Sequence, residues 1–261
     1  MNKRLWCVFA GFCGFAMLAL CTIPSGAQAS EVKEKPPMYS YIANWQIPRA
    51  QWGDAEKVNA TRKAILDKAL ADGTIVGFGD DENLVHQPDG ETHDNWWAAM
   101  SMAGLIKVLD QFAAASNPAS NALLAGATKH WDAIFVSRYY NWKPGSWKGG
   151  YVHVGIYKLK PDAPDDAVET LSKNMVVPMM EKLLADGTIQ EYEVDTQAIH
   201  TSAPSTFELV YVCPNPEGLD KVNAAIAETM KSSPMSGPAF TSMVDSNAHR
   251  DELLKGNGTY K

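Results

Sequence analysis

The sequence LADGTI at Leu70–Ile75 recurs unchanged at Leu184–Ile189, an offset of 114 positions (184 − 70). The same offset also aligns Ile42 with Ile156, Lys68 with Lys182, His86 with His200, and GLIKV at 104–108 with GLDKV at 218–222. One shared hexapeptide can arise by chance, whereas a register kept over this distance indicates an internal repeat. The chain therefore predicts two tandem copies of one folding unit.

Both copies show the same order of secondary-structure elements. Each begins with a strand rich in aromatic and β-branched residues, from Met38 and from Tyr151, followed by a helix that ends at the ADG sequence. Two strands, a second helix and a fourth strand follow, and Pro178 predicts a kink or break in one helix. Strand-helix-strand-strand-helix-strand is the ferredoxin-like βαββαβ order. We expect an α+β fold with one repeat at 38–150, including a connecting loop, and a second at 151–261.

With its duplicated topology, the chain resembles the dimeric α+β barrel superfamily, which includes antibiotic-biosynthesis-monooxygenase-like, EthD-like and YciI-like proteins. The resemblance covers about residues 38–261 and depends on topology, without a diagnostic motif. It implies that the antiparallel sheets of the two repeats pack together as an intramolecular barrel. A monomer with an internal pseudo-two-fold axis follows from this, because the partner sheet lies in the same chain. No catalytic residue is transferred from the superfamily.

Residues 1–29 have the features of a secretory signal peptide. Lys3 and Arg4 precede an apolar run to about Cys21, and the small residues Ala27 and Ala29 fit a cleavage site after Ala29. The apolar run is short for a membrane span. We expect a secreted or periplasmic protein, with residues 30–37 as an N-terminal linker and no membrane attachment after cleavage.

Charge and cysteine content exclude several functions. The full chain has a net charge of −7 and contains no basic block, so neither nucleic acid nor an anionic membrane surface is an expected partner. After cleavage Cys213 would be the only cysteine, which leaves no internal disulfide. No basic side chain accompanies it in sequence, so a buried and unreactive thiol is expected.

Strand alternation separates two sets of side chains. Ile42, Val154 and Ile156 share one face, which we expect to pack on the helices. The opposite face is aromatic, and we expect it to line the barrel and bind substrate through Tyr39, Tyr41, Trp97, Tyr157 and Tyr211. Such a face would accommodate a flat, partly apolar molecule. The alternative is that these rings fill the barrel as ordinary sheet packing.

Three residues are candidates for catalysis. His153 lies in mid-strand among tyrosines and could exchange a proton near neutral pH, although a hydrogen-bonded core histidine is the alternative. Arg138, in the aromatic stretch SRYYNWKPGSWKGG at 137–150, could bind a carboxylate or an enolate-like oxygen, and Tyr140 beside it could contact substrate. That stretch could equally be a linker whose aromatic rings pack on both halves. Tyr41 completes the catalytic set.

His86 and His200 occupy equivalent positions and are either ligand contacts or supports of a hairpin. Because some barrels of the resembled superfamily hold haem, His153, His86 or His200 could serve as an axial ligand, but no haem-attachment motif is present. His86, Asp89, Glu91, His93 and Asp94 could form a metal site, yet an acidic, solvated turn explains them as well. We therefore expect neither a metal nor a cofactor.

Together these patterns predict a secreted barrel that binds a small aromatic or polyketide-like molecule. The resemblance implies that such barrels perform cofactor-independent oxygenation or isomerisation in an apolar cavity, which makes a monooxygenase or isomerase-like enzyme one hypothesis. A non-catalytic binding or interaction protein with a filled barrel is the alternative. The sequence does not decide between them.

Overall fold

The computed structural model describes residues 32–115, 122–123, 125–201, 203–232 and 236–261. The expected signal peptide, 1–29, lies outside the described residues, as do the first two residues of the expected linker. Val32–Lys261 forms one compact unit. Within the described ranges no helix is long and apolar enough to cross a membrane.

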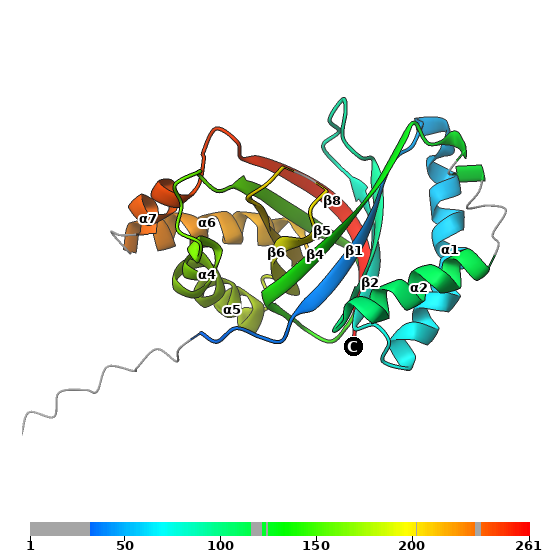
Figure 1. Cartoon of the computed structure of the whole chain (residues 1–261), viewed down its shortest axis with the longest axis horizontal. Coiled ribbons are helices and arrows are strands. Elements are labelled where there is room, and N and C mark those ends of the chain that lie inside the picture. Colours follow the sequence, from blue (N-terminus) through cyan, green and yellow to red (C-terminus); the bar gives the residue numbers. More distant parts are fainter. Residues whose placement is uncertain (1–31, 116–121, 124, 202, 233–235) are drawn as a thin grey trace, which may run out of the picture. The chain divides into compact units, whose positions relative to one another are not determined.

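The centre of this unit is a closed barrel of antiparallel strands (Figure 1). Around the barrel the strands follow the order β1-β3-β2-β8-β5-β7-β6-β4, and β4 pairs with β1 to close it. The strands are β1 (Met38–Gln46), β2 (Gly77–Asn83), β3 (His93–Ala99), β4 (Lys129–Trp142), β5 (Gly145–Lys158), β6 (Glu191–Ile199), β7 (Thr206–Cys213) and β8 (Arg250–Tyr260). The expected α+β barrel is therefore confirmed.

The helices cover the outside of the barrel. α1 and α2 lie over the strands of the first half, and α4 to α7 lie over those of the second half (Figure 1). Their bounds are α1 (Trp52–Ala71), α2 (Met102–Ala114), α4 (Ala167–Leu171), α5 (Val177–Asp186), α6 (Pro216–Ser232) and α7 (Ser236–Met243), with a 3₁₀ turn at Arg49–Gln51 before α1. The helices thus cover much of the outer face of the barrel, whereas outward-facing residues of β8 such as Lys255 and Asn257 stay exposed.

The two LADGTI segments fold in the same way. Gly73 and Gly187 end α1 and α5 in the left-handed conformation, with φ of +78° and +84°. The carboxylates of Asp72 and Asp186 accept hydrogen bonds from the backbone N–H of the following threonines, at 3.0 and 2.9 Å. The closing isoleucines, Ile75 and Ile189, are completely buried. Each segment thus ends a helix and anchors the chain where it enters the next strand.

The connection between the halves is shorter than expected. β4 runs to Trp142 and β5 starts at Gly145, so only Lys143 and Pro144 separate them. The stretch 137–150, which we considered as a linker, is almost entirely strand. Its tyrosines and tryptophans favour extended backbone, and Gly145 and Gly149 adopt the positive φ values that the turn and a β-bulge require.

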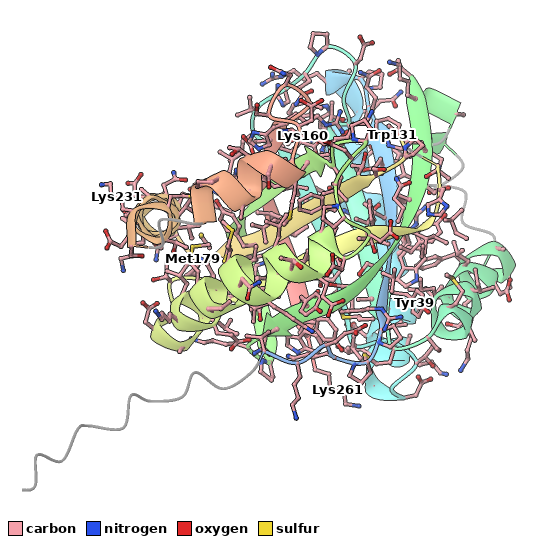
Figure 2. The ribbon with its side chains drawn as sticks, turned by 60° about the vertical axis from the view of Figure 1, so that its left-hand side comes forward. Tyr39, Trp131, Lys160, Met179, Lys231 and Lys261 are labelled. Atoms are coloured by element: carbon pink, nitrogen blue, oxygen red, sulfur yellow. The ribbon has the colours of Figure 1, made fainter. Side chains whose placement is uncertain are left out.

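The expected irregularity at Pro178 is present. Residues Ser172–Val176 form one π-helical turn directly before α5, and Pro178 lies in the first turn of α5. Proline has no N–H to donate, so the preceding turn widens. Met175 of the π-helical turn is buried in the apolar cluster of the second half, so the wider turn stays part of the core. Met179 of α5, labelled in Figure 2, packs against the same cluster.

Three apolar clusters form the core, and they correct our assignment of the faces. Tyr41 and Trp97 belong to a cluster shared with α1 and α2, while Tyr157 and Tyr211 pack with α5 to α7. The third cluster, which includes Val152, contains no helical residue and lies inside the barrel. The aromatic face therefore points outward to the helices, and the aliphatic face lines the interior. The interior of an eight-stranded barrel is just wide enough for side chains to fill, and here valines share it with the rings of Trp96, Trp147 and Tyr260.

Candidate functional site

A large cavity lies on the outer, aromatic face of the first half. It has a volume of about 650 Å³ and separates α1 from β2, β3, β8 and the start of β5. We call it the α1 cleft. Its lining includes Trp52, Glu56, Asn59, Arg62, Lys63, Leu66, Phe78, Asp80, His93, Asn95, Trp97, Phe112, Lys148, Lys255 and Asn257. The lining combines aromatic and aliphatic side chains with a larger number of charged and amide side chains, so it offers a small molecule both apolar surface and hydrogen-bonding groups.

Amide side chains make up much of the polar part of the α1 cleft. Asn95 Nδ2 donates to Asn59 Oδ1 at 2.8 Å, which joins β3 to α1, and Arg62 donates to Asn95 Oδ1 at 3.4 Å. On the β8 side, Asn257 Nδ2 donates to Asp80 Oδ2 at 3.2 Å. Burial raises the pKa of Asp80, so this carboxyl is less acidic than a surface aspartate. The cleft therefore presents hydrogen-bond donors and acceptors on rigid elements.

His93 is a titratable group of this cleft whose pKa is strongly lowered. Burial, with a smaller effect of the nearby His86, lowers its pKa to about 4, so the imidazole is neutral at pH 7. Its Nδ1 lies 3.0 Å from Thr92 Oγ1, and the Trp52 ring packs edge-on at 5.3 Å. A neutral imidazole can accept a proton or donate a hydrogen bond to a ligand. The sequence analysis did not select His93 as a catalytic or substrate-binding residue.

Trp97 is the one expected substrate-binding residue that lines the cleft. Its ring stacks on Tyr41 at 4.3 Å and meets Phe112 edge-on at 5.5 Å, and its Nε1 donates to the carbonyl of Leu105 at 3.3 Å. Tyr41 lies behind Trp97 and is not part of the lining. Burial raises the pKa of the Tyr41 phenol, which keeps its proton. Tyr41 thus positions Trp97.

His153 lies at a different place, on the outer face of the second half. It stacks on Tyr211 at 4.8 Å, and its Nε2 is 3.4 Å from Asp251 Oδ1. His249 approaches the same oxygen at 3.0 Å and stacks on Tyr157 at 4.6 Å. Burial lowers the pKa of His153 despite the aspartate. The structure therefore brings His153, Tyr157 and Tyr211 together, but apart from the α1 cleft.

The remaining expected site residues do not line either cavity. Arg138 is exposed and pairs with Glu34 at 2.5 Å, which explains its position without a ligand. Tyr140 faces the barrel interior and donates its hydroxyl proton to the Pro36 carbonyl at 2.9 Å. Tyr39 packs against the cluster under α1 and α2, and His200 is exposed just beyond β6.

The histidines and the acidic turn separate in space. His86 packs edge-on against Trp52 outside the cleft lining, Asp94 points into the barrel, and exposed Asp89 pairs with Lys129. Among the described residues no group of three or more histidine, cysteine or carboxyl side chains has metal-binding geometry. None of His86, His153 and His200 lines either cavity, so these residues do not fit haem as axial ligands. Cys213 is buried, and burial raises its pKa to about 12.

A second, smaller cavity lies inside the barrel. Its volume is about 70 Å³, and strand residues alone line it. We call its acidic side chains the interior carboxyls: Asp81, Asp94, Glu191, Glu193, Asp195 and Glu208. No lysine, arginine or histidine lines this cavity. Sequence reasoning missed the carboxyls, although Glu191, Glu193 and Asp195 alternate with other residues along β6 and so had to share one face.

Burial and mutual repulsion make these groups weak acids. Burial, followed by repulsion from Asp80, raises the pKa of Asp81 to about 7, and burial raises that of Glu208 to about 7. The pKa values of Asp94, Glu191 and Asp195 also rise, because of burial first and neighbouring carboxyls second. At pH 7 the barrel interior therefore favours carboxyls that are protonated or paired with a cation over ionised carboxylates without a partner.

Comparisons with known proteins identify the fold. A candidate monooxygenase from Lactobacillus acidophilus NCFM superposes with a TM-score of 0.58 at 12% identity, over 85% of this chain and 94% of that one. A candidate monooxygenase from Fusobacterium nucleatum subsp. nucleatum gives 0.56 at 9% identity, over 87% and 95%. An anthrone oxidase-like protein gives 0.51 at 9% identity, over 85% and 92%. No family model matches the chain, and no curated protein matches it. These likenesses show the dimeric α+β barrel fold.

Proposed function

We propose that this protein binds a flat, partly apolar molecule of the aromatic or polyketide-like class in the α1 cleft. The observation that carries the proposal is the cleft itself, about 650 Å³ in volume, on the aromatic face of the sheet. Trp97 and Phe78 offer apolar surface, while Asn59, Asn95 and Asn257 offer hydrogen bonds for hydroxyl or carbonyl groups. Structural neighbours described as monooxygenases and as anthrone oxidase-like are compatible with such a ligand.

The cleft also has the groups for proton transfer without a cofactor. His93 is neutral at pH 7 and could take the proton of a phenolic or enolic hydroxyl. Arg62, Lys148 and Lys255 line the same cleft and would stabilise the oxyanion that forms. Returning that proton to a different atom of the ligand completes an isomerisation. Reaction of the anion with dissolved O₂ would make the same site a cofactor-independent monooxygenase, if a CH₂ group of the ligand is oxidised to a carbonyl by one oxygen atom and its two hydrogens leave with the other as water.

Binding without turnover is the second candidate function. The pKa of His93, about 4, makes it a weak base, which favours hydrogen bonding over proton abstraction. Most expected site residues serve packing, as Tyr41 and Tyr211 do. His153, with Asp251 beside it, stays a candidate proton-transfer group of a separate outer-face site.

Tandem duplication is part of the proposal. Gly104 and Gly218, 114 positions apart (218 − 104), pack on the carbonyls of Thr74 and Thr188, where an added Cβ would come within 2.6 and 2.9 Å of the oxygen. The two halves thus repeat a tertiary contact as well as a sequence. We further propose that the protein is secreted or periplasmic and works as a monomer, because each half supplies the sheet that the other needs.

The test is native mass spectrometry with an absorption spectrum on mature protein purified from its own host. A retained aromatic molecule, lost in Asn95→Ala and Trp97→Leu but kept in His153→Ala, would support the α1 cleft. Turnover of that molecule, abolished by His93→Ala with affinity unchanged, would support the enzyme. A ligand that survives both cleft variants and leaves with His153→Ala would contradict the proposed site.

A further inference from the structure

One wall of the barrel interior is aromatic, and it is built over glycines. Trp96, Trp147 and Tyr260 lie together, with ring centroids 5.4 to 6.3 Å apart. A Cβ on Gly79 would collide with Trp96, one on Gly258 with Trp147, and one on Gly77 with Tyr260. β2 and β8 therefore have no side chains at these positions because the rings occupy that space.

The opposite wall is acidic. Glu191, Glu193 and Asp195 of β6 and Glu208 of β7 line the same cavity, with Asp81 and Asp94 at its β2–β3 side. Two glutamates are held by the Tyr260 hydroxyl, which lies 2.9 Å from Glu191 Oε1 and 2.6 Å from Glu193 Oε1. The negative charge is thus concentrated across a small cavity from three electron-rich rings.

Several polar atoms at this cavity have no partner. Among the described residues, Asp94 Oδ1, Asp195 Oδ1, Glu191 Oε2 and Trp147 Nε1 are buried without a hydrogen bond. Their side chains are 7, 2, 4 and 8% exposed. Buried polar atoms are almost always hydrogen-bonded in native proteins, so this set indicates a missing occupant. The indole N–H is independent of the acidic cluster and faces the same cavity.

We propose that the barrel interior binds a small organic ammonium ion. Its N–H groups would donate to the unpartnered carboxylate oxygens, and its positive charge would face Trp96, Trp147 and Tyr260 in a cation–π arrangement. Its carbon atoms would contact Val152, Val154, Val210 and Val212, which complete the lining. A hydroxyl or carbonyl oxygen on the same molecule would accept from Trp147 Nε1.

The lining favours an organic cation over a metal ion. Within the described part of the chain no three carboxyl, histidine or cysteine side chains converge as metal ligands. A hydrated divalent ion would also leave valine and tryptophan surface against water, whereas a methylammonium group covers it. Asp81, Trp96 and Trp147 line both cavities, whereas Glu191, Glu193, Asp195 and Glu208 line the interior cavity and not the α1 cleft. This site does not depend on the proposed function, because the carboxyls of β6 and β7 that would hold the ammonium group lie outside the α1 cleft.

Isothermal titration calorimetry and thermal unfolding test this site. At pH 7.5, with sodium chloride at matched ionic strength as the reference, we expect methylammonium and ethanolammonium chloride to bind and to raise Tm. Glu191→Gln and Trp147→Leu should each weaken binding about tenfold or more. Asn95→Ala, in the α1 cleft, should bind methylammonium as the wild type does. Circular dichroism checks that each variant is folded, and Trp96→Phe offers a milder change to the same wall.

Three results would overturn the proposal. Stabilisation by calcium or magnesium but not by the ammonium ions would make this a metal site. Loss of ammonium binding in Asn95→Ala but not in Glu191→Gln would move it to the α1 cleft. If no cation binds, and infrared spectra show protonated carboxyls at pH 7.5, protons alone occupy the interior. Failure of the aromatic-ligand test leaves each of these outcomes unchanged, so the two proposals fail separately.

Discussion

The hydroxyl of Tyr260 lies 2.6 Å from Oε1 of Glu193, inside the closed barrel. The same hydroxyl is 2.9 Å from Glu191, yet it carries one proton and can donate to one carboxylate at a time. Tyr260, Glu191 and Glu193 must therefore share one additional proton, or the second carboxylate needs a different hydrogen-bond donor. Burial and the two glutamates raise the pKa of the phenol, so Tyr260 itself keeps its proton.

Tyr260→Phe removes this donor and leaves two buried glutamates facing each other. We expect the free energy of unfolding to fall by about 1–3 kcal/mol, with a larger loss at pH 8 than at pH 5 because protonated glutamates tolerate the change. Urea denaturation at both pH values measures this. Tyr39→Phe is the control, since no hydrogen bond of that hydroxyl is present among the described residues. Equal losses in the two variants would contradict the assigned role.

The interior carboxyls predict that stability falls as pH rises. The folded-state pKa values of the interior carboxyls Asp81 and Glu208 are each raised to about 7, mainly by burial. The pKa of Glu252 on β8, which interacts with Glu208, is raised to about 8, also mainly by burial. Between about pH 4.5 and 8 the folded protein thus binds more protons than the unfolded chain, and stability must decrease with pH across that range. The other charged or titratable groups near these carboxyls are Asp80, Asp94, Glu191, Glu193, Asp195, Glu91, Arg250 and Tyr260.

Urea denaturation without added amines should show a loss of a few kcal/mol from pH 5 to pH 8.5. Glu208→Gln cannot ionise and should flatten part of the slope. Glu217→Gln, which changes a carboxyl in the first turn of α6, is the matched control and should leave the slope unchanged. A profile that is flat or that rises towards pH 8.5 would contradict the buried, weakly acidic interior.

Gly104 and Gly218 contact the threonines of the two LADGTI segments, and they predict that substitution lowers stability equally in the two halves. Gly104→Ala and Gly218→Ala each force a methyl group against a threonine carbonyl, at 2.6 and 2.9 Å. We expect each to lower stability by about 1–3 kcal/mol. Gly53→Ala, in α1 with no atom within 4 Å of the added Cβ, should be neutral or stabilising by about 0.5–1 kcal/mol. A large loss in one half alone would argue against equivalent packing.

The pKa of His93 predicts the pH dependence of any reaction in the α1 cleft. Because the imidazole loses its proton near pH 4, binding or turnover that needs the neutral form should be constant from about pH 5.5 to 7.5. His93→Gln should keep hydrogen bonding but abolish proton transfer, so affinity is retained while kcat falls at least tenfold. A pH profile with an inflection near 6.5 would instead assign the proton transfer to a solvent-exposed histidine.

The sequence analysis expected the aromatic face inside the barrel, whereas that face points outward. His93, Asn95 and Trp97 alternate along β3 and line one cavity, and Trp97 is the one of them that the sequence analysis expected to bind substrate. The interior carboxyls were not recognised at all, because acidic residues in alternate positions usually mark a solvated face.

The repeated LADGTI, with the register that extends from it, predicted an α+β chain of two similar halves, and the superfamily resemblance implied the barrel that the structure has. A local signal achieved this because helix caps, turns and strand alternation depend on neighbouring residues. Strand alternation shows which side chains share a face of the sheet and places the neighbours Tyr41 and Ile42 on opposite faces. It does not show which face points into the barrel. Apolar clusters lie both under the helices outside the barrel and within its interior, so hydrophobicity does not distinguish the two faces. Only the closure of β4 onto β1 decided that the carboxyls lie inside and the aromatic cleft outside.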